Sequence, residues 1–153
     1  MKILAIDPGS SCGFAIGRLG DPPVSGVWSL APARGESPGM RYVRLRAHLN
    51  KMLEAYPDLN LVAFESAHHR GGAATEYAIG CSTLIQTWCA DHNVNHASVH
   101  SATLKKWATG GGRANKDEMV RLGRTRFKPT TETDDEVDAL WILDYALAMW
   151  APL

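Results

Sequence analysis

Short apolar runs separated by turn residues fill the first part of the chain. One run begins at Ile3 and ends at the carboxylate of Asp7, and two more follow, with glycines and prolines between them. Runs of this length bounded by turn residues favour strands, and three such strands with short connections form an antiparallel meander. We therefore predict strands at residues 3–7, 12–18 and 24–30.

A helical period follows the meander and alternates with two further strand-like runs. Apolar residues recur at spacings of three and four between residues 40 and 56, as on one face of a helix. A later run is short and apolar and again ends in a carboxylate, that of Glu65. The predicted strands are 60–65 and 94–99, and the predicted helices are 40–56, 73–91, a short helix that Ser101 caps and that ends near Gly110, 115–127, and a last helix from about Asp134.

This order of elements places the chain in the α/β class. Three strands followed by alternating helices and strands imply a five-stranded mixed sheet flanked by helices, which is the order of a ribonuclease H-like fold. A length of 153 residues, with 45% apolar and 21% charged residues, suits one hydrophobic core. We expect residues 1–153 to form a single domain.

The composition favours a cytoplasmic protein with no membrane partner. No stretch approaches the roughly 18 apolar residues of a membrane helix. The apolar run before Asp7 is too short for a signal peptide. The three cysteines, Cys12, Cys81 and Cys89, form no CxxC pair and suit reduced thiols.

A net charge of zero conceals two charged blocks. Residues 102–128 hold eight basic residues and two acids, whereas residues 129–153 hold six acids and neither Lys nor Arg. Segregation of this kind suits a protein that binds phosphates with one part and cations with another. Two solvated helix faces would give the same pattern, so charge alone leaves both interpretations open.

Acidic residues at three separate places are the strongest chemical signal. Asp7 and Glu65 end predicted strands, and Asp135 and Asp138 share one face of the last helix. If the first and fourth strands are neighbours, the four carboxylates meet and repel one another. Hard divalent cations such as Mg²⁺ offset this repulsion, and two ions about 4 Å apart can promote phosphodiester hydrolysis. Each acid alone would be an ordinary surface group or helix cap, but the combination predicts a metal site.

A glycine-rich segment between lysines is the second signal. It reads Leu-Lys-Lys-Trp-Ala-Thr-Gly-Gly-Gly-Arg-Ala-Asn-Lys and contains Lys105, Lys106, Arg113 and Lys116. Glycines allow a backbone to approach a phosphate chain closely, and the cations can neutralise phosphates without reading bases. A flexible linker between two solvated helices would have the same composition, so that alternative stays open.

These segments, in this order, resemble the motifs of the RuvC Holliday-junction resolvases. The residues Ile-Asp-Pro-Gly-Ser at 6–10, with Gly-Phe-Ala at 13–15, resemble the first motif, and Phe-Glu at 64–65 resembles the second. Segment 105–116 is similar to the lysine- and glycine-rich segment of the family, and 135–140 to its final Asp-x-x-Asp-Ala-Leu motif. ATPases of the actin and sugar-kinase type also open with Asp-x-Gly, but the four motifs together are specific and span nearly the whole chain.

The resemblance implies a Mg²⁺-dependent crossover junction endodeoxyribonuclease, with two ions per site that Mn²⁺ can replace. It implies a homodimer that nicks two opposed strands of a four-way DNA junction symmetrically, as in DNA recombination and repair. It also makes the helix at 73–91 the dimer element, where Gly80 would allow close approach of helices. By motif, the catalytic and metal-binding acids are Asp7, Glu65, Asp135 and Asp138, and the DNA-binding residues are Lys105, Lys106, Arg113 and Lys116.

The chain departs from the family pattern in two respects. Bacterial members place a phenylalanine soon after the glutamate, where it stacks on a base at the crossover. This chain instead has His68 and Arg70 in that segment, and we expect these residues to contact DNA. The chain is also shorter than a typical bacterial resolvase, which suits a bacterial or phage-encoded protein of a compact type.

Three alternative functions remain open at this point. One is a ribonuclease H-like nuclease that cuts hybrids, flaps or other branched DNA. Another is an ATPase of the actin or sugar-kinase type, which would need a second such domain to clamp a nucleotide. The third is a DNA-binding module without catalysis, against which the four acids argue.

Overall fold

The computed structural model describes residues 1–9, 11–67, 71–111 and 113–151, and these form the predicted elements in the predicted order. The strands are β1 (Lys2–Asp7), β2 (Ser11–Arg18), β3 (Val24–Ser29), β4 (Leu59–Glu65) and β5 (Asn95–Val99). The helices are α1 (Met40–Ala55), α2 (Gly72–His92), α3 (Ser101–Thr109), α4 (Lys116–Phe127) and α5 (Asp134–Trp150).

The strands form one mixed sheet in the order β3-β2-β1-β4-β5. Strands β1, β2 and β3 pair antiparallel as a meander, while β4 pairs parallel to β1 and β5 parallel to β4. The chain returns from β3 through α1, which brings the first and fourth strands side by side. The predicted α/β class with a five-stranded mixed sheet is confirmed.

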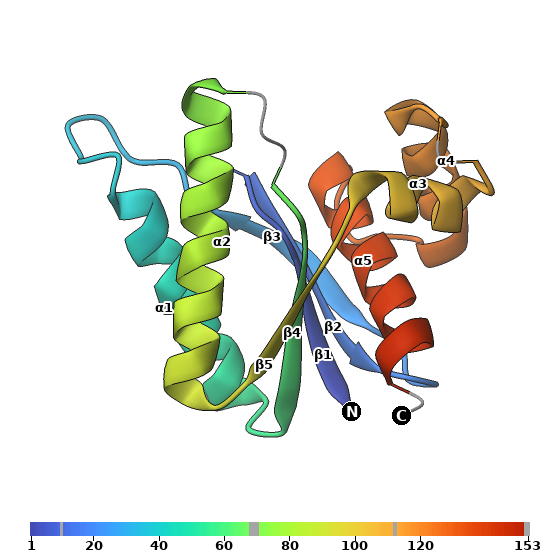
Figure 1. Ribbon diagram of the computed structural model, residues 1–153, viewed down its shortest axis with the longest axis horizontal. Coiled ribbons are helices and arrows are strands. Elements are labelled where there is room, and N and C mark those ends of the chain that lie inside the picture. Colours follow the sequence, from blue (N-terminus) through green and yellow to red (C-terminus); the bar gives the residue numbers. More distant parts are fainter. Residues whose placement is uncertain (10, 68–70, 112, 152–153) are drawn as a thin grey trace.

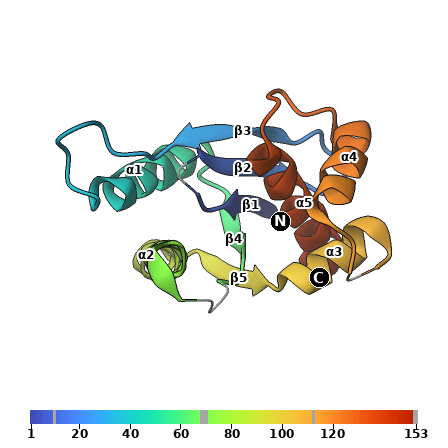
Figure 2. The same cartoon turned by 90° about the horizontal axis from the view of Figure 1, so that it is seen from above.

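Helices cover both faces of this sheet (Figure 1). Helices α1 and α2 lie on one face, and α3, α4 and α5 lie on the other, as the view from above also shows (Figure 2). Successive residues of a strand point to opposite faces. In β1, Leu4 and Ile6 join the core beneath α1 and α2, whereas Ile3 and Ala5 join the core beneath α5. By this alternation Asp7 falls on the α5 face.

Helices α4 and α5 pack closely enough to fix their ends relative to each other. Gly123 of α4 lies against Val137 and Trp141, and an added Cβ would come 2.4 Å from Cγ1 of Val137. The indole N–H of Trp141 donates a hydrogen bond to the carbonyl oxygen of Met119 at 2.9 Å. The close contact brings the beginning of α4 beside the first turns of α5.

Two sequence-based expectations about these helices are wrong. Ser101 is the first residue of α3 and not its cap, because His100 holds the cap position without a side-chain hydrogen bond. Gly80 serves packing within the chain, because an added Cβ would come 2.5 Å from the hydroxyl oxygen of Tyr42 in α1. Gly80 therefore lies inside the α1–α2 contact and is not available for close approach of a second subunit. None of the helices described here is both long and apolar enough to cross a membrane.

Candidate metal centre and nucleic-acid interface

The ends of β1 and β4 place two acids at one edge of the sheet. Ile6 and Phe64 are partners in the parallel ladder, so Asp7 and Glu65 follow them at adjacent strand ends. Leu61 and Ala63 of β4 pack into the α5 core, which puts Glu65 on the same face as Asp7. Asp7 and Glu65 therefore lie at neighbouring strand ends on one face of the sheet, as the sequence predicts.

Helix α5 adds two carboxylates to this edge. One oxygen of each of Asp7, Asp135 and Asp138 can be chosen so that all three lie within 4.8 Å of one another. Glu65 is not one of these three, but it acts electrostatically on Asp7 and lines the same cleft as Asp138. The structure thus brings the four predicted acids to one place, three of them in direct proximity and Glu65 beside them.

Crowding changes how easily Asp7 ionises. Burial raises its pKa well above the ordinary value, and the charges of Asp138, Asp135 and Glu65 raise it further, with only Lys116 acting in the opposite direction. Such a group favours its charged form once a cation replaces the missing solvation. The electrostatics are those expected of a site that needs added positive charge.

Lys116 supplies part of that charge from the first turn of α4. The side chain of Asn115 caps this helix by accepting a hydrogen bond from the backbone N–H of Glu118 at 2.8 Å. The Lys116 ammonium lies 3.2 Å from the carboxylate of Asp138. Partial burial opposes its charge, but Asp138, Asp7 and Asp135 outweigh this effect and raise the pKa of Lys116.

A glycine that sequence reasoning did not single out for a role sets the distance between α5 and the sheet. Gly13 is the partner of Asp7 in the β1–β2 ladder. A Cβ at this position would come 1.8 Å from the backbone carbonyl oxygen of Asp135. Only glycine therefore lets the first turn of α5 rest on the sheet beside Asp7. The unusual close packing could not be seen in the sequence, although Gly13 stands within the first motif.

A second residue missed by sequence reasoning, Glu136, anchors the start of α5. Its side chain is fully buried and accepts hydrogen bonds from Ser25 Oγ at 2.8 Å and from the backbone N–H groups of Thr130 and Thr131 at 2.9 and 2.7 Å. Burial opposes ionisation of Glu136, but these bonds and those from the threonine hydroxyls outweigh it, so its pKa is lowered. Because Asp135 and Glu136 are neighbours, the anchor fixes one side of the helix while the other faces Asp7.

A tyrosine of α2 holds the turn that follows β1. Tyr77 donates its hydroxyl hydrogen to the carbonyl oxygen of Gly9 at 2.9 Å. Gly9 lies two residues after Asp7 in the sequence. The contact joins α2, through a buried side chain, to the turn that follows Asp7.

A cleft of about 560 Å³ opens beside the acids. Glu65, Asp138, Lys105 and Lys116 contribute its charged groups. Small residues from the start of α2 and apolar residues from α3 and α4 complete its wall, namely Gly71, Ala74, Thr75, Ala78, Ser101, Leu104 and Met119. The cleft can admit a phosphate backbone, and its wall carries both cations and carboxylates.

The predicted DNA-binding cations occupy different positions. Lys105 and Lys116 line the cleft, whereas Lys106 and Arg113 are exposed residues that are not part of its wall. His68 and Arg70 lie outside the described residues, so their predicted contacts with DNA stay predictions.

The basic and acidic blocks of the sequence partly neutralise each other. Arg124 forms an ion pair with Asp134 at 3.1 Å, and Arg126 pairs with Asp144 at 3.0 Å. Fewer cations are therefore available to an outside partner than the local charge of the segment indicates.

The donors of the acid cluster fit a hard divalent cation. All are carboxylate oxygens, the ligands that Mg²⁺ and Mn²⁺ prefer. Burial and the neighbouring carboxylates raise the pKa of Asp7, and a bound cation would offset both effects. Asp7, Asp135 and Asp138 would hold it, with Glu65 beside them.

Comparison with known proteins supports the same fold. No family profile matches the chain, and no curated protein matches it by sequence. Among solved structures, Thermus thermophilus RuvC in complex with a Holliday junction substrate is similar at 18% identity and a TM-score of 0.75, covering 97% of this chain and 96% of that one. Another Thermus thermophilus RuvC structure gives 20% identity and a TM-score of 0.68, with coverage of 93% and 90%.

A viral resolvase shows the same likeness across a greater sequence distance. The fowlpox virus resolvase, solved with substrate Holliday junction DNA, is 13% identical with a TM-score of 0.60, covering 96% of this chain and 99% of that one. At these identities the likeness is one of fold. The chain therefore has the fold of the RuvC-type resolvases, as the motif resemblance predicts.

Proposed function

We propose that this protein is a metal-dependent endonuclease that resolves four-way DNA junctions. The observation that carries the proposal is the convergence of Asp7, Asp135 and Asp138, with Glu65 beside them, in a chain with the resolvase fold. Structures of that fold from Thermus and fowlpox virus are complexes with Holliday junction DNA. Fold and acid cluster together favour phosphodiester hydrolysis over binding alone.

Each group of the site has a role in this proposal. Asp7, Glu65, Asp135 and Asp138 would hold two Mg²⁺ ions, for which Mn²⁺ could substitute. When bound, the ions would activate a water molecule and stabilise the leaving oxygen of the scissile phosphodiester. Lys116 holds the carboxylate of Asp138 in place, and Lys105 binds a phosphate in the cleft. Lys106 and Arg113 bind phosphates further from the acids, and His68 and Arg70 contact DNA near the crossover.

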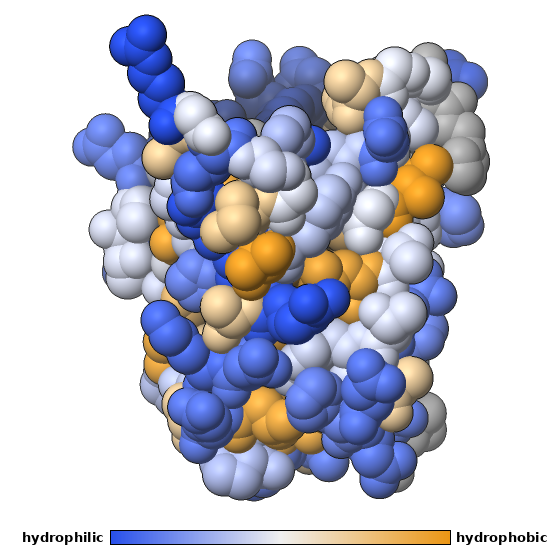
Figure 3. Space-filling model, turned by 90° about the vertical axis from the view of Figure 1, so that its left-hand side faces the viewer, coloured by the Kyte–Doolittle hydropathy of each residue, from blue (hydrophilic) through white to orange (hydrophobic). Residues whose placement is uncertain are grey.

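A homodimer would let one complex cut two opposed strands. The outer side of α1 and α2 presents apolar patches among hydrophilic residues (Figure 3). Val43 of α1 is 50% exposed and Ile79 of α2 is 41% exposed, so both apolar side chains are available to a partner surface. We propose that the side of α2 that carries Ile79 contributes to the dimer, without the role first expected of Gly80.

The decisive experiment is nicking of a labelled synthetic four-way junction in Mg²⁺. Linear duplex, flap and RNA/DNA hybrid substrates are tested beside it, with Asp7→Asn as the inactive variant. We expect paired symmetric cuts on the junction, absent in the variant and absent with EDTA. If flaps or hybrids are cut in preference to the junction, the result would support the metal site but contradict junction resolution. Junction binding without any cutting would reject catalysis and leave a DNA-binding module.

A further inference from the structure

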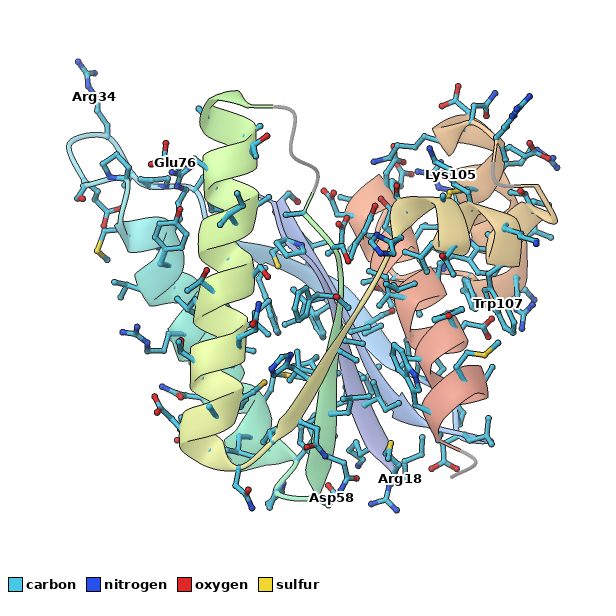
Figure 4. All side chains as sticks on the ribbon, viewed as in Figure 1. Arg18, Arg34, Asp58, Glu76, Lys105 and Trp107 are labelled. Carbon is cyan, nitrogen blue, oxygen red and sulfur yellow. The ribbon has the colours of Figure 1, made fainter. Side chains whose placement is uncertain are left out.

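A second basic segment lies on the α1 side of the acid cluster. Residues 31–51 hold five basic residues and one acid. They form the loop before α1 and most of that helix, on the sheet face opposite to α3 and α4. Figure 4 shows Arg34 and Lys105 at the same end of the molecule, with α2 between them. This is also the end at which β1 delivers Asp7 (Figure 1).

The loop before α1 is folded around an internal ion pair. Arg44 contacts the carboxylate of Glu36 at 2.6 Å and donates to the carbonyl oxygen of Ala31 at 3.2 Å. The same carboxylate accepts a hydrogen bond from the backbone N–H of Ala33 at 2.6 Å. Arg44 and Glu36 therefore neutralise each other. Arg34 is not part of this ion pair and is exposed at the outer part of the loop (Figure 4). Within the described chain, Arg34 has no carboxylate partner.

Arg41 is the second cation of this segment that lacks an acid. Its Nε donates to the carbonyl oxygen of Pro38 at 3.1 Å, and its guanidinium carbon lies 4.3 Å from the ring centroid of Tyr77. Tyr77 in turn is bonded to Gly9, in the turn directly after β1. Arg41 is thus held in place beside the turn that leads from Asp7, with its charge unmatched among the residues described. An ordered, unmatched guanidinium is suited to bind a phosphate, because little side-chain freedom remains to be lost.

We propose that Arg34 and Arg41 form a second phosphate-binding surface, which holds a DNA arm on the α1 side of the acid cluster. This proposal rests on the proposed function, since it assigns a further contact to the same branched substrate. A junction presents phosphates in several directions from its crossover, and the lysines of α3 and α4 lie on only one side of the acids. Arg34 and Arg41 supply the other side.

One acid lies close to this surface. Glu76 precedes Tyr77 in α2, is exposed, and stands on the side of α2 that faces the loop (Figure 4). Its charge opposes binding of a phosphate there. Neutralising Glu76 should therefore strengthen DNA binding, which is the opposite of the effect of neutralising either arginine.

The test is the salt dependence of four-way junction binding in EDTA, where no strand is cut. Arg34→Gln and Arg41→Gln are compared with Lys51→Gln, an exposed cation ten residues beyond Arg41 and near the far end of α1. Each arginine variant should reduce the slope of log K against log salt by about 0.9, the value for one lost phosphate contact on duplex DNA. Lys51→Gln should leave the slope unchanged, and Glu76→Gln should tighten binding at each salt concentration.

Thermal unfolding checks that the Arg41 variant keeps its fold, and Arg34→Gln alters only an exposed loop residue. Unchanged slopes in both arginine variants, or an equal loss in Lys51→Gln, would overturn the proposed surface. Nicking in Mg²⁺ is scored separately. Normal nicking with unchanged slopes rejects only this surface, whereas reduced slopes without any nicking by the wild type support the surface and reject the nuclease. Absence of junction binding rejects both.

Discussion

Asp7 is the residue on which burial and the charges of its neighbours act most directly in the acid cluster. Burial and three neighbouring carboxylates all act against its charge, while Lys116 is the one cation that favours it among the groups identified as influencing its pKa. Such an arrangement destabilises the folded protein when no metal is present, because like charges are held together. The same arrangement becomes favourable when a divalent cation is bound.

We therefore predict opposite effects of Asp7→Asn with and without metal. Without Mg²⁺ the variant should unfold at a higher temperature than the wild type, because one charge of the cluster is removed. At a Mg²⁺ concentration 100-fold above Kd, the wild type should gain about 2.7 kcal/mol of stability and the variant far less. Thermal unfolding with and without Mg²⁺ measures both effects.

Asp134→Asn is the matched control for this prediction. Asp134 also stands in the first turn of α5, but it pairs with Arg124 and is not in the group of three acids. Its loss should leave the gain from Mg²⁺ intact. Equal behaviour of the two variants would show that Mg²⁺ acts on the overall charge and not at the cluster.

At the scale of elements, the placement of α5 decides whether the acids meet. The helix rests on β2 at Gly13 and is tied to β3 and the loop before it through Glu136. In addition to the apolar packing of α5 on the sheet, these two contacts fix its first turn, and with it Asp135, relative to β2 and β3. One missing side chain and one buried carboxylate thus help to set the geometry of the acid cluster.

We predict that Gly13→Ala lowers the free energy of unfolding by about 1–3 kcal/mol, the usual cost of overpacking a close contact. The added methyl group would overlap the backbone at Asp135 and push α5 from the sheet. Mg²⁺ affinity should fall as well, because the carboxylates separate. Denaturant unfolding and Mg²⁺-dependent shifts of the unfolding temperature measure the two losses.

Gly17→Ala provides the comparison within the same strand. A Cβ at Gly17 would meet its nearest neighbours at 3.4 and 3.6 Å, which is ordinary contact. We expect this variant to bind Mg²⁺ as the wild type does. If both alanine variants lose metal binding equally, the general cost of altering β2, and not the position of α5, explains the loss.

For the whole molecule, the important property is the arrangement of charge around one end of the sheet. Acids lie at the strand ends, with cations of α3 and α4 on one side and those of the α1 segment on the other. The net charge of zero says nothing of this arrangement, because opposite charges cancel in the sum while remaining apart in space.

If the proposed dimer cuts both strands, mixing active and inactive subunits should separate the two cuts. With an excess of Asp7→Asn over wild type, most active subunits sit in mixed dimers. Junctions should then be nicked in one strand, with fewer paired cuts, as gels with both strands labelled would show. A fraction of paired cuts that is independent of the excess would mean that each subunit acts alone.

Much of this protein could be predicted from its sequence, for a local physical reason. The run from Ile3 to Asp7 predicts a buried strand that ends in a carboxylate, and the helical spacing after residue 40 predicts α1. Both predictions are possible because these periods depend only on near neighbours in the chain. The motif order also predicted the fold and named the four acids. His100 at the start of α3 shows the limit, since capping depends on local geometry that a serine alone does not fix.

Tertiary structure alone decided how close these residues come and which of them remain available. Gly13 beneath Asp135, Gly80 against Tyr42 and the pairing of Arg124 with Asp134 are contacts between separate elements. Sequence patterns do not report such distances, because any helix face or strand position could carry the same residue type. The sequence thus determined the elements and the chemical groups, and the packing of α1 and α5 on the sheet determined the site and the free cations around it.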